Sequence, residues 1–378
     1  MIYLDYAATT PMSDEALEVF AKTAKHLYGN PSSLHDIGSS AANLLETARS
    51  QIAKLLHGEK SGLYFTSGGS ESNILALQSL LDANREKGSH VITTKCEHAS
   101  VYNLFQKWEQ QGFAVTYLPV NANGTVEISE LEKAIRPDTI LASIQYVNSE
   151  IGTIQPIGRI GEILHERNVI FHCDAVQAFG KIPIDVEHLH IDALSVSSHK
   201  IYGPKGVGAV YLNPRRKWKA QIPGTTHEKG FRPGTVNVPG IAGFAAAARA
   251  IYNTMDRENE RMHALRNELI RQLREIPGAK VVLVGDPDRT LPNIVGLRIV
   301  GMEGQVAMLE CNRHGVAIST GSACSVGSQE PSRTIKALGR TDDEAKEFIR
   351  LSFGKFTTRD DILQAAAVLR KVTDSYFG

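Results

Sequence analysis

The feature that most restricts the fold is a repeated unit of strand, loop and helix. Apolar runs at 91–94, 140–144 and 169–171 each lead into a polar loop, and helical patterns of ten to fifteen residues separate such runs. Strands that alternate with helices in this way are typical of a mostly parallel sheet with helices on both faces. In such sheets, ligands bind beyond the carboxyl ends of the strands. The pattern therefore predicts an α/β fold with a binding crevice at those ends.

Polar side chains follow several of the predicted strands directly. Taken one at a time, each has an ordinary structural explanation, such as a helix N-cap for Asp174 or a surface amide for Gln177. Their shared position at strand ends favours a single site instead. The residues that one crevice would collect are Ser70, His98, Asn148, Asp174, Gln177 and Lys200.

Lys200 is the strongest candidate among them. The runs 191–196 and 206–212 are typical of buried strands, so Lys200 is expected at a strand end and not on a solvated helix face. A lysine there can form a Schiff base with an aldehyde cofactor, while the neighbouring Ser197, Ser198 and His199 bind its phosphate or order the lysine. The alternative is a structural lysine in a turn, which is the commoner role of an isolated lysine.

A candidate anion site lies before the three strand runs named above. The run 63–66 is a short apolar strand that leads through Gly68 and Gly69 into a helix. Backbone N–H groups at the start of that helix, with Gly69 allowing close approach and Ser70 supplying a hydroxyl, can bind an anion. An ordinary turn with an N-cap is the alternative. A nicotinamide oxidoreductase is a weak hypothesis, because the spaced third glycine of the dinucleotide fingerprint does not follow.

Composition narrows the class of protein. The 378 residues are 42% hydrophobic and 22% charged, which are ordinary values for a globular chain with a sizeable core. Forty-one basic residues balance 41 acidic ones without a basic tract, so direct nucleic-acid or membrane partners are not expected. The start of the chain lacks the features of a targeting segment, which favours a cytoplasmic protein. The four cysteines have neither disulfide-framework nor metal-ligand spacing, so no metal is expected.

The last third of the chain has a different character. A long Ala-rich and charged helical region, 241–275, precedes short strands that alternate with helices, the latter expected at 303–313, 344–348 and 358–376. We interpret this part as a smaller α+β domain with the long helix as connector. It contains a Gly/Ser-rich stretch, 318–331, with Cys324 inside it. A cysteine in an exposed loop departs from the usual burial of this residue, although a spare loop thiol is the alternative.

With these pieces in place, the chain resembles the cysteine desulfurases, pyridoxal-phosphate enzymes of the class V aminotransferase group. The long Gly/Ser loop around Cys324 is similar to that of the NifS and IscS subgroup of these enzymes. It differs from the short Arg-x-Gly-His-His-Cys segment of the other subgroup. The implied fold is the PLP-dependent transferase (aspartate aminotransferase-like) fold. It would have a large domain at 15–255, with 1–14 and 256–378 forming the small one. The matching motifs occur in order over nearly the whole length, at 5–11, 66–73, 97–98, 148–152, 174–177, 197–200, 232–235, 321–324 and 350–354.

The resemblance implies roles around the cofactor, pyridoxal 5'-phosphate. Lys200 would hold the cofactor as a Schiff base and later remove the substrate Cα proton, and His98 would stack on the ring and transfer protons. Asp174 would keep the pyridine nitrogen protonated, and Gln177 would bond the phenolic oxygen. Thr235 would reach the phosphate from the other subunit of a homodimer. The remaining phosphate ligands would be Gly69, Ser70, Ser197 and His199.

The resemblance also implies the substrate site and the reaction. Arg350, helped by Asn148, would bind the carboxylate of L-cysteine, and Cys324 would take its sulfur as a persulfide while L-alanine leaves. The sulfur would pass to an acceptor protein, such as an iron–sulfur scaffold or a thiolation enzyme. The chain departs from the common Gly-Gly-Gly-Gln-Glu run at 223–228, a difference that concerns the loop and its partner surface, and has Ser70 where threonine is common.

Two alternatives stay open at this point. One is a selenocysteine lyase or an aminotransferase on the same fold, which the product would distinguish. The other is a non-catalytic sulfur-carrier scaffold that uses Cys324 only as a docking thiol. Lys200 and its predicted pocket argue against the second alternative.

Overall fold

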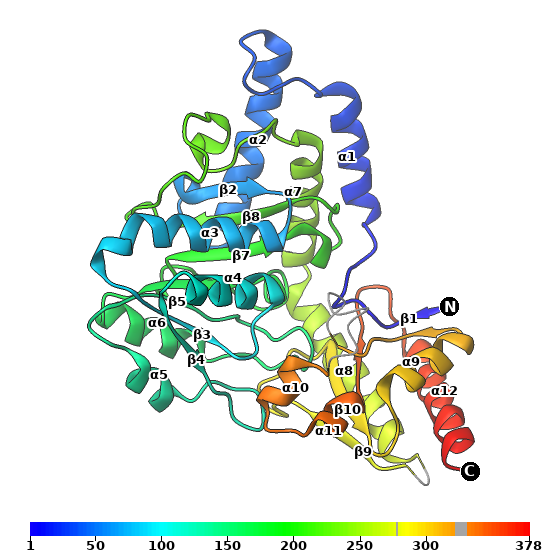
Figure 1. Ribbon diagram of the computed structural model, residues 1–378. Helices are drawn as coiled ribbons and strands as arrows, with labels where there is room; N and C mark the ends of the chain where they lie inside the picture. Colours follow the sequence, from blue (N-terminus) through cyan, green and yellow to red (C-terminus); the bar gives the residue numbers. More distant parts are fainter. Residues whose placement is uncertain (277–278, 322–330) are drawn as a thin grey trace.

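The computed structural model describes residues 1–276, 279–321 and 331–378 (Figure 1). Cys324, the predicted sulfur acceptor, lies outside the described residues. The chain forms an α/β structure around a seven-stranded sheet, with a smaller three-stranded sheet nearer the C-terminus. Among the described helices, none combines the length and the apolarity needed to cross a membrane.

The large sheet has the strand order β2-β8-β7-β6-β5-β3-β4. All neighbours pair in parallel except β8, which runs antiparallel to both β2 and β7. Most of these strands are buried on both faces, which explains why they are continuous apolar runs in the sequence. The strands are β2 (Leu63–Thr66), β3 (His90–Thr94), β4 (Ala114–Leu118), β5 (Thr139–Ser143), β6 (Ile170–Asp174), β7 (Ala193–Ser197) and β8 (Gly208–Leu212).

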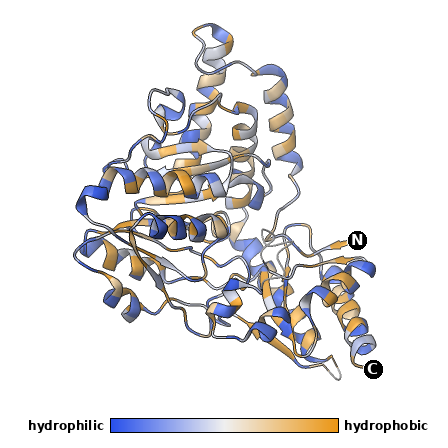
Figure 2. Ribbon diagram, in the orientation of Figure 1, coloured by the Kyte–Doolittle hydropathy of each residue, from blue (hydrophilic) through white to orange (hydrophobic). Residues whose placement is uncertain are grey.

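Helices cover both faces of this sheet. Successive strand residues belong to different cores, as Val91 packs with α3 and α4 while Ile92 packs with α2, α6 and α7. In Figure 2 the strands of this sheet are mainly hydrophobic, whereas many of the helices carry both hydrophobic and hydrophilic residues. Ser13 caps the first helix by accepting from Ala16 N, as its position predicts. The helices are α1 (Asp14–His26), α2 (Asp36–Leu55), α3 (Gly69–Asn84), α4 (Ala99–Gln110), α5 (Ile128–Ala134), α6 (Ile157–Glu166) and α7 (Val238–Tyr252).

The smaller sheet is antiparallel and has its own core. Its order is β12-β10-β9, and its core includes Leu269, Leu297 and Leu369. The helices and strands of this part of the chain are α8 (Met255–Arg274), β9 (Val281–Val284), β10 (Ile294–Ile299), α9 (Gly304–Arg313), β11 (Val316–Ala317), α10 (Arg333–Ala337), α11 (Asp342–Lys346), β12 (Phe348–Ser352) and α12 (Arg359–Phe377), of which β11 pairs with β1 and not with the smaller sheet. Short 3₁₀ helices occur at η1 (Lys60–Gly62), η2 (Arg85–Lys87), η3 (Ser198–Lys200) and η4 (His227–Gly230).

Two expected elements differ from the structure. The helical region 241–275 is two helices with different surroundings. The first, α7, is almost wholly buried and covers the large sheet, whereas α8 turns one apolar face to the small core. The helix expected at 344–348 is α11, which starts earlier at a capping box on Thr341 and ends before Phe348. Phe348 instead opens the buried strand β12.

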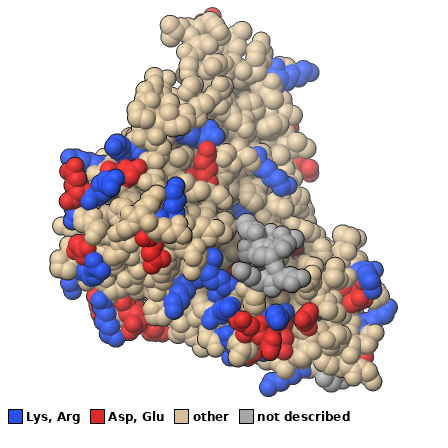
Figure 3. Space-filling model, in the orientation of Figure 1, with Lys and Arg blue, Asp and Glu red and all other residues tan. Residues whose placement is uncertain are grey.

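The N-terminal segment links the two sheets. β1 (Ile2–Tyr3) pairs in parallel with β11, and Ser352 N at the end of β12 donates to Leu4 O. A few residues on, Thr10 N donates to His199 O, next to Lys200. The first ten residues thus bring the ends of β12 and β7 together. On the face drawn in Figure 3, acidic and basic side chains lie interspersed, in keeping with the balanced composition.

Candidate active site

A hollow of about 830 Å³ lies at the carboxyl ends of the parallel strands, and we call it the active-site hollow. The strand-end pattern in the sequence predicts this position, because parallel strands end on the same side of the sheet. Segments from both sheets and from the N-terminus contribute to its wall. The predicted site residues that line it are Gly69, Ser70, His98, Asp174, Gln177, Ser197, His199, Lys200 and Arg350.

Lys200 ends η3, directly after β7, and its ammonium faces the N-terminal segment. Its Nζ donates to Ala7 O at 2.6 Å and to Ala8 O at 2.7 Å. The neighbouring His199 places Nδ1 3.0 Å from Thr9 Oγ1. Burial, with Lys200 as the next cause, lowers the pKa of His199 to about 4. The imidazole is therefore neutral near pH 7.

A hydrogen-bond network joins Asp174 to His98 through Asn73. Asn73 Nδ2 donates to Asp174 Oδ2 at 2.8 Å and to Ser100 Oγ at 3.0 Å. His98 Nδ1 accepts from Ser100 N at 3.2 Å and lies 2.8 Å from Ser100 Oγ. A neutral His98 therefore carries its proton on Nε2. Val176 N donates to the other oxygen of Asp174 at 3.0 Å, so both carboxylate oxygens are held in place.

The start of α3 forms an anion cradle. Gly68 has φ +150°, a conformation that L side chains rarely adopt, and a Cβ on Gly69 would lie 2.7 Å from Val176 Cγ2. Only glycine therefore fits where the chain turns into the helix. Ser197 Oγ, close by, is buried and has no hydrogen-bond partner among the described residues. A buried hydroxyl in this condition indicates a ligand that would bond it.

Arg350, on β12, is a buried cation with spare hydrogen-bonding capacity. Its Nη2 donates to Asp5 Oδ1 at 2.6 Å and its Nη1 to Ser149 O at 2.9 Å. Its Nε has no hydrogen-bond partner in the described part of the chain. The guanidinium therefore lines the hollow with a donor available to an incoming carboxylate.

Asn148 does not line the hollow. It is buried beneath the wall, where its Oδ1 accepts from Glu150 N at 2.9 Å and Ile151 N at 3.1 Å. Its Nδ2 donates to Cys96 O at 3.2 Å. The side chain thus fixes the turn whose Ser149 carbonyl holds Arg350.

Thr235 is exposed and lies outside the wall of the hollow, in the segment between η4 and α7. Arg232 ties that segment to α3, because its Nε donates to Glu71 Oε2 at 2.8 Å. Glu71 directly follows Ser70 of the cradle.

Sequence reasoning assigned no role to four residues that contribute to the site. Asn73 stands one helical turn after Gly69, and that spacing was the available signal. Asp5 and the carbonyl groups of Ala7 and Ala8 have no comparable signal, because their contacts arise from distant parts of the chain. The described residues contain no group of His, Cys, Asp and Glu side chains suited to a metal ion.

Known proteins with the same architecture define the class. The family model described as "Aminotransferase class-V" matches residues 2–364. The "Putative cysteine desulfurase NifS" of Bacillus subtilis (strain 168) is 52% identical over 96% of this chain and 92% of its own length. The cysteine desulfurase IscS of Clostridium botulinum (strain Hall) is 41% identical over 98% and 94%.

Solved structures agree. A NifS-like protein superposes with a TM-score of 0.93 at 31% identity, covering 99% of both chains. A structure described as "SspA in complex with cysteine" gives a TM-score of 0.83 at 34% identity, covering 95% of this chain and all of that one. The chain therefore belongs to the class-V aminotransferases. Within that family it is a pyridoxal-phosphate-dependent cysteine desulfurase of the NifS and IscS type.

The residues present fit pyridoxal phosphate. The glycine cradle at the start of α3 and the unpartnered Ser197 hydroxyl suit a phosphate group. Across the same hollow, Asp174 offers a carboxylate to a ring nitrogen, and Lys200 offers a primary amine to an aldehyde.

Proposed function

We propose that this enzyme takes the sulfur of L-cysteine as a persulfide on Cys324, releases L-alanine and passes the sulfur to an acceptor protein. The observation that carries the proposal is the active-site hollow, which collects an amine, a carboxylate, two imidazoles, a buried guanidinium and an anion cradle. The similar SspA structure is a complex with cysteine, which supports L-cysteine as the substrate.

The cofactor would be held from three directions. Gly69, Ser70, Ser197 and His199 would bind its phosphate, and Asp174, held by Asn73 and Val176 N, would face its ring nitrogen. Gln177, whose Nε2 also donates to Ala7 O at 2.9 Å, would bond its phenolic oxygen. When bound, the cofactor supplies a ring that withdraws electrons from the carbon atoms of an amino acid.

Proton transfer falls to Lys200 and His98. As a neutral amine, released from the Ala7 and Ala8 carbonyls, Lys200 Nζ would accept the proton of the substrate Cα. The Nδ1 of His98 is used by the Ser100 backbone, which leaves Nε2 as the nitrogen that gives or takes a proton in the hollow. The Asn73 network fixes the imidazole for this task.

Arg350 would bind the substrate carboxylate. Its Nε is the donor available for that bond, and the contacts with Asp5 and Ser149 orient the guanidinium. Asn148 would act through the turn that carries Ser149 and not by direct contact with the substrate.

The sulfur step balances as a simple exchange. The thiolate of Cys324 forms a bond to the substrate sulfur, the Cβ–S bond breaks, and the carbon that keeps the electron pair is protonated. Alanine leaves, and Cys324 carries a persulfide. The other three thiols are buried, and burial raises the pKa of Cys96, Cys173 and Cys311, to about 12 for Cys311. Buried, protonated thiols are poor nucleophiles, which supports Cys324.

The same proposal includes a homodimer. Thr235 is exposed and lies outside the active-site hollow of its own chain, which supports a contact with the partner's phosphate site.

The proposal also includes two domains, a large domain at 15–255 and a small domain at 1–14 and 256–378. The separate hydrophobic cores support this division. A cytoplasmic location is supported by the free thiols among the described cysteines, because reducing compartments keep thiols unpaired.

The test replaces Cys324 by Ser, with Cys311→Ser as the matched control. Cys324→Ser should bind the cofactor normally, since Lys200 and its neighbours are untouched, but release alanine at least about 10³-fold more slowly. Cys311→Ser should turn over like wild type. Mass spectrometry of wild type after brief exposure to cysteine should find one added sulfur on the peptide that contains Cys324. An added sulfur on another cysteine, or normal turnover by Cys324→Ser, would refute the proposed nucleophile.

A further inference from the structure

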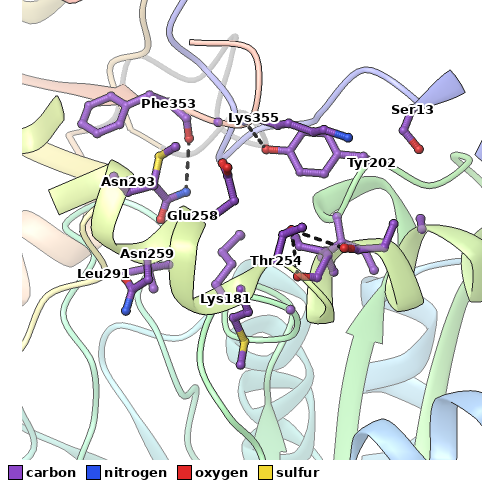
Figure 4. A pocket seen from close by; sticks show the side chains of 18 of the residues that line it. Ser13, Lys181, Tyr202, Thr254, Glu258, Asn259, Leu291, Asn293, Phe353 and Lys355 are labelled. Atoms are coloured by element: carbon purple, nitrogen blue, oxygen red, sulfur yellow. Dashed lines mark hydrogen bonds between the residues drawn. The ribbon is translucent and has the colours of Figure 1, made fainter. Parts of the chain in front are cut away.

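A second hollow, of about 680 Å³, lies between the end of α7, the start of α8 and the segment that follows β12 (Figure 4). We call it the rear hollow. Its wall is mainly apolar, as is usual for the binding sites of small ligands. The apolar part of the wall includes Ile201, Ile251, Met255, Met262, Leu291 and Phe353.

Lys181 connects the rear hollow to the active-site hollow. It lines the rear hollow, and its Nζ donates to both Gln177 O and Gln177 Oε1 at 3.1 Å. Gln177 lines the active-site hollow on the other side and holds Ala7 O, the carbonyl that also accepts from Lys200. One lysine thus lies between the two hollows, a single hydrogen bond from a residue of the active site.

The charge of Lys181 is unbalanced. It has no carboxylate partner among the described residues, and its charged neighbours inside the protein include Lys200. Glu258, on the opposite wall, is already paired with Arg261 at 2.8 Å. Burial and the nearby Lys200 lower the pKa of Lys181 to about 7. The remaining ionisable groups of the wall are Tyr202, which is protonated because burial raises its pKa, and the exposed Lys355.

We propose that the rear hollow binds a small amphiphilic anion, of the class of short-chain or aromatic carboxylates, with Lys181 as the ligand of its anionic group. The apolar wall contacts the hydrocarbon part of the ligand. The ammonium of Lys181 binds its anionic group, which supplies the negative charge that no side chain of the described structure provides there. Because the same ammonium bonds Gln177, an occupant changes the hydrogen bonding of a residue of the active-site hollow. The effect on the cofactor rests on the proposed function, whereas the binding site itself does not.

Calorimetric titration with hexanoate and 1-hexanol tests the site, because the two probes share a chain and differ in charge. Near pH 6.5, hexanoate should bind at least about tenfold more tightly than hexanol, the range expected when a hydrogen bond gains a charged partner. Lys181→Met should remove this preference, and Lys181→Arg should restore it. Lys355→Met, at the solvent-exposed mouth, should change hexanoate affinity by less than about fivefold. Arg350→Gln should leave it unchanged, which separates the rear hollow from the substrate site.

The pH dependence has a defined sign. Lys181 loses its proton as pH rises through about 7, so the affinity for hexanoate should fall between pH 7 and pH 9 while that for hexanol stays constant. Equal binding of acid and alcohol by wild type would overturn the site. A preference that persists in folded Lys181→Met would do the same, with the fold checked by circular dichroism.

A separate measurement addresses the link to the active site. Hexanoate should shift the visible band of the cofactor-loaded enzyme in wild type but not in Lys181→Met. Binding without a band shift would refute the coupling through Gln177 while the binding site stands. Absence of any visible band would count against the proposed cofactor contacts and leave the calorimetric result intact.

Discussion

Arg49 and Arg350 are buried to the same degree, 2% and 1% exposed, but their surroundings differ. Arg49, on α2, donates from both terminal nitrogens to the two oxygens of Glu228, at 2.7 and 2.9 Å. Its Nε bonds Glu46 and its Nη1 also bonds Leu63 O. Arg350 has one carboxylate contact, one carbonyl contact and a nitrogen without a partner in the described chain.

The difference separates a structural charge from a functional one. A buried guanidinium whose three nitrogens all donate to protein groups holds the fold together and has little to offer a ligand. The Arg49 pair does this for η4, since Glu228 Oε2 also accepts from Phe65 N and so fastens the loop to β2. In the active-site hollow, Arg350 keeps a donor in reserve, and Lys200 donates to two neutral carbonyls. Substitutions that remove contacts of the Arg49–Glu228 pair should lower stability. Substitutions of Arg350 or Lys200 in the active-site hollow should lower turnover.

The largest effect is expected at Lys200. Lys200→Ala removes the amine that holds the cofactor and takes the Cα proton, so turnover should fall by at least about 10⁴-fold. The free energy of unfolding should fall by no more than about 1–3 kcal/mol, the cost of leaving the Ala7 and Ala8 carbonyls without this donor. Alanine release and urea denaturation measure the two quantities. Normal alanine production would end the assignment of Lys200.

The second-largest effect is expected at Glu228, in the structural region around Arg49, and it concerns the free energy of unfolding. Glu228→Gln leaves Arg49 buried with one partner charge removed, and the free energy of unfolding should fall by about 3–5 kcal/mol. Glu15→Gln is the matched control, because its ion pair with Arg249 is exposed and should be worth less than about 1 kcal/mol. Urea unfolding followed by circular dichroism compares them. A loss at Glu228 no greater than that at Glu15 would contradict the structural role of the pair.

The smallest of the three effects concerns the substrate. Arg350→Gln removes the charge that would bind the cysteine carboxylate, so kcat/KM should fall about 10- to 150-fold. The loss should appear mainly as a raised KM, with cofactor binding unchanged by absorbance. An unchanged KM would show that the reserved Nε donor of Arg350 is not used by the substrate.

The sequence predicts most of the central sheet because those strands are buried on both faces and are therefore continuous apolar runs. β4 was missed because Ala114–Leu118 is a half-buried strand at the edge of the sheet, with polar Thr116 in its middle. β1 is only two residues long and becomes a strand through pairing with β11. Neither has enough local signal to be predicted.

The hollow itself was predictable, since parallel strands bring their carboxyl ends together and place Lys200, Asp174 and His98 near one another. The contacts of these residues were not. Asp5 and Arg350 are 345 positions apart, and main-chain carbonyls such as that of Ala7 act without regard to side-chain type. Lys181 gave no signal either, because its importance depends on a hollow between α7 and α8.

The N-terminal segment has a consequence for how the molecule is made. Asp5 and Ala7 are each made 345 positions before their partners on β12, Arg350 and Ser352. Contacts between residues so far apart in sequence form late, because the loop that joins them must be closed first. The strands of the large sheet, the last of which ends at Leu212, can therefore pair before β12 is made, whereas Asp5 and Ala7 gain their β12 partners only afterwards. Nascent chains that stop before residue 348 should then lack the Asp5–Arg350 ion pair and leave the N-terminal segment without its β12 partners.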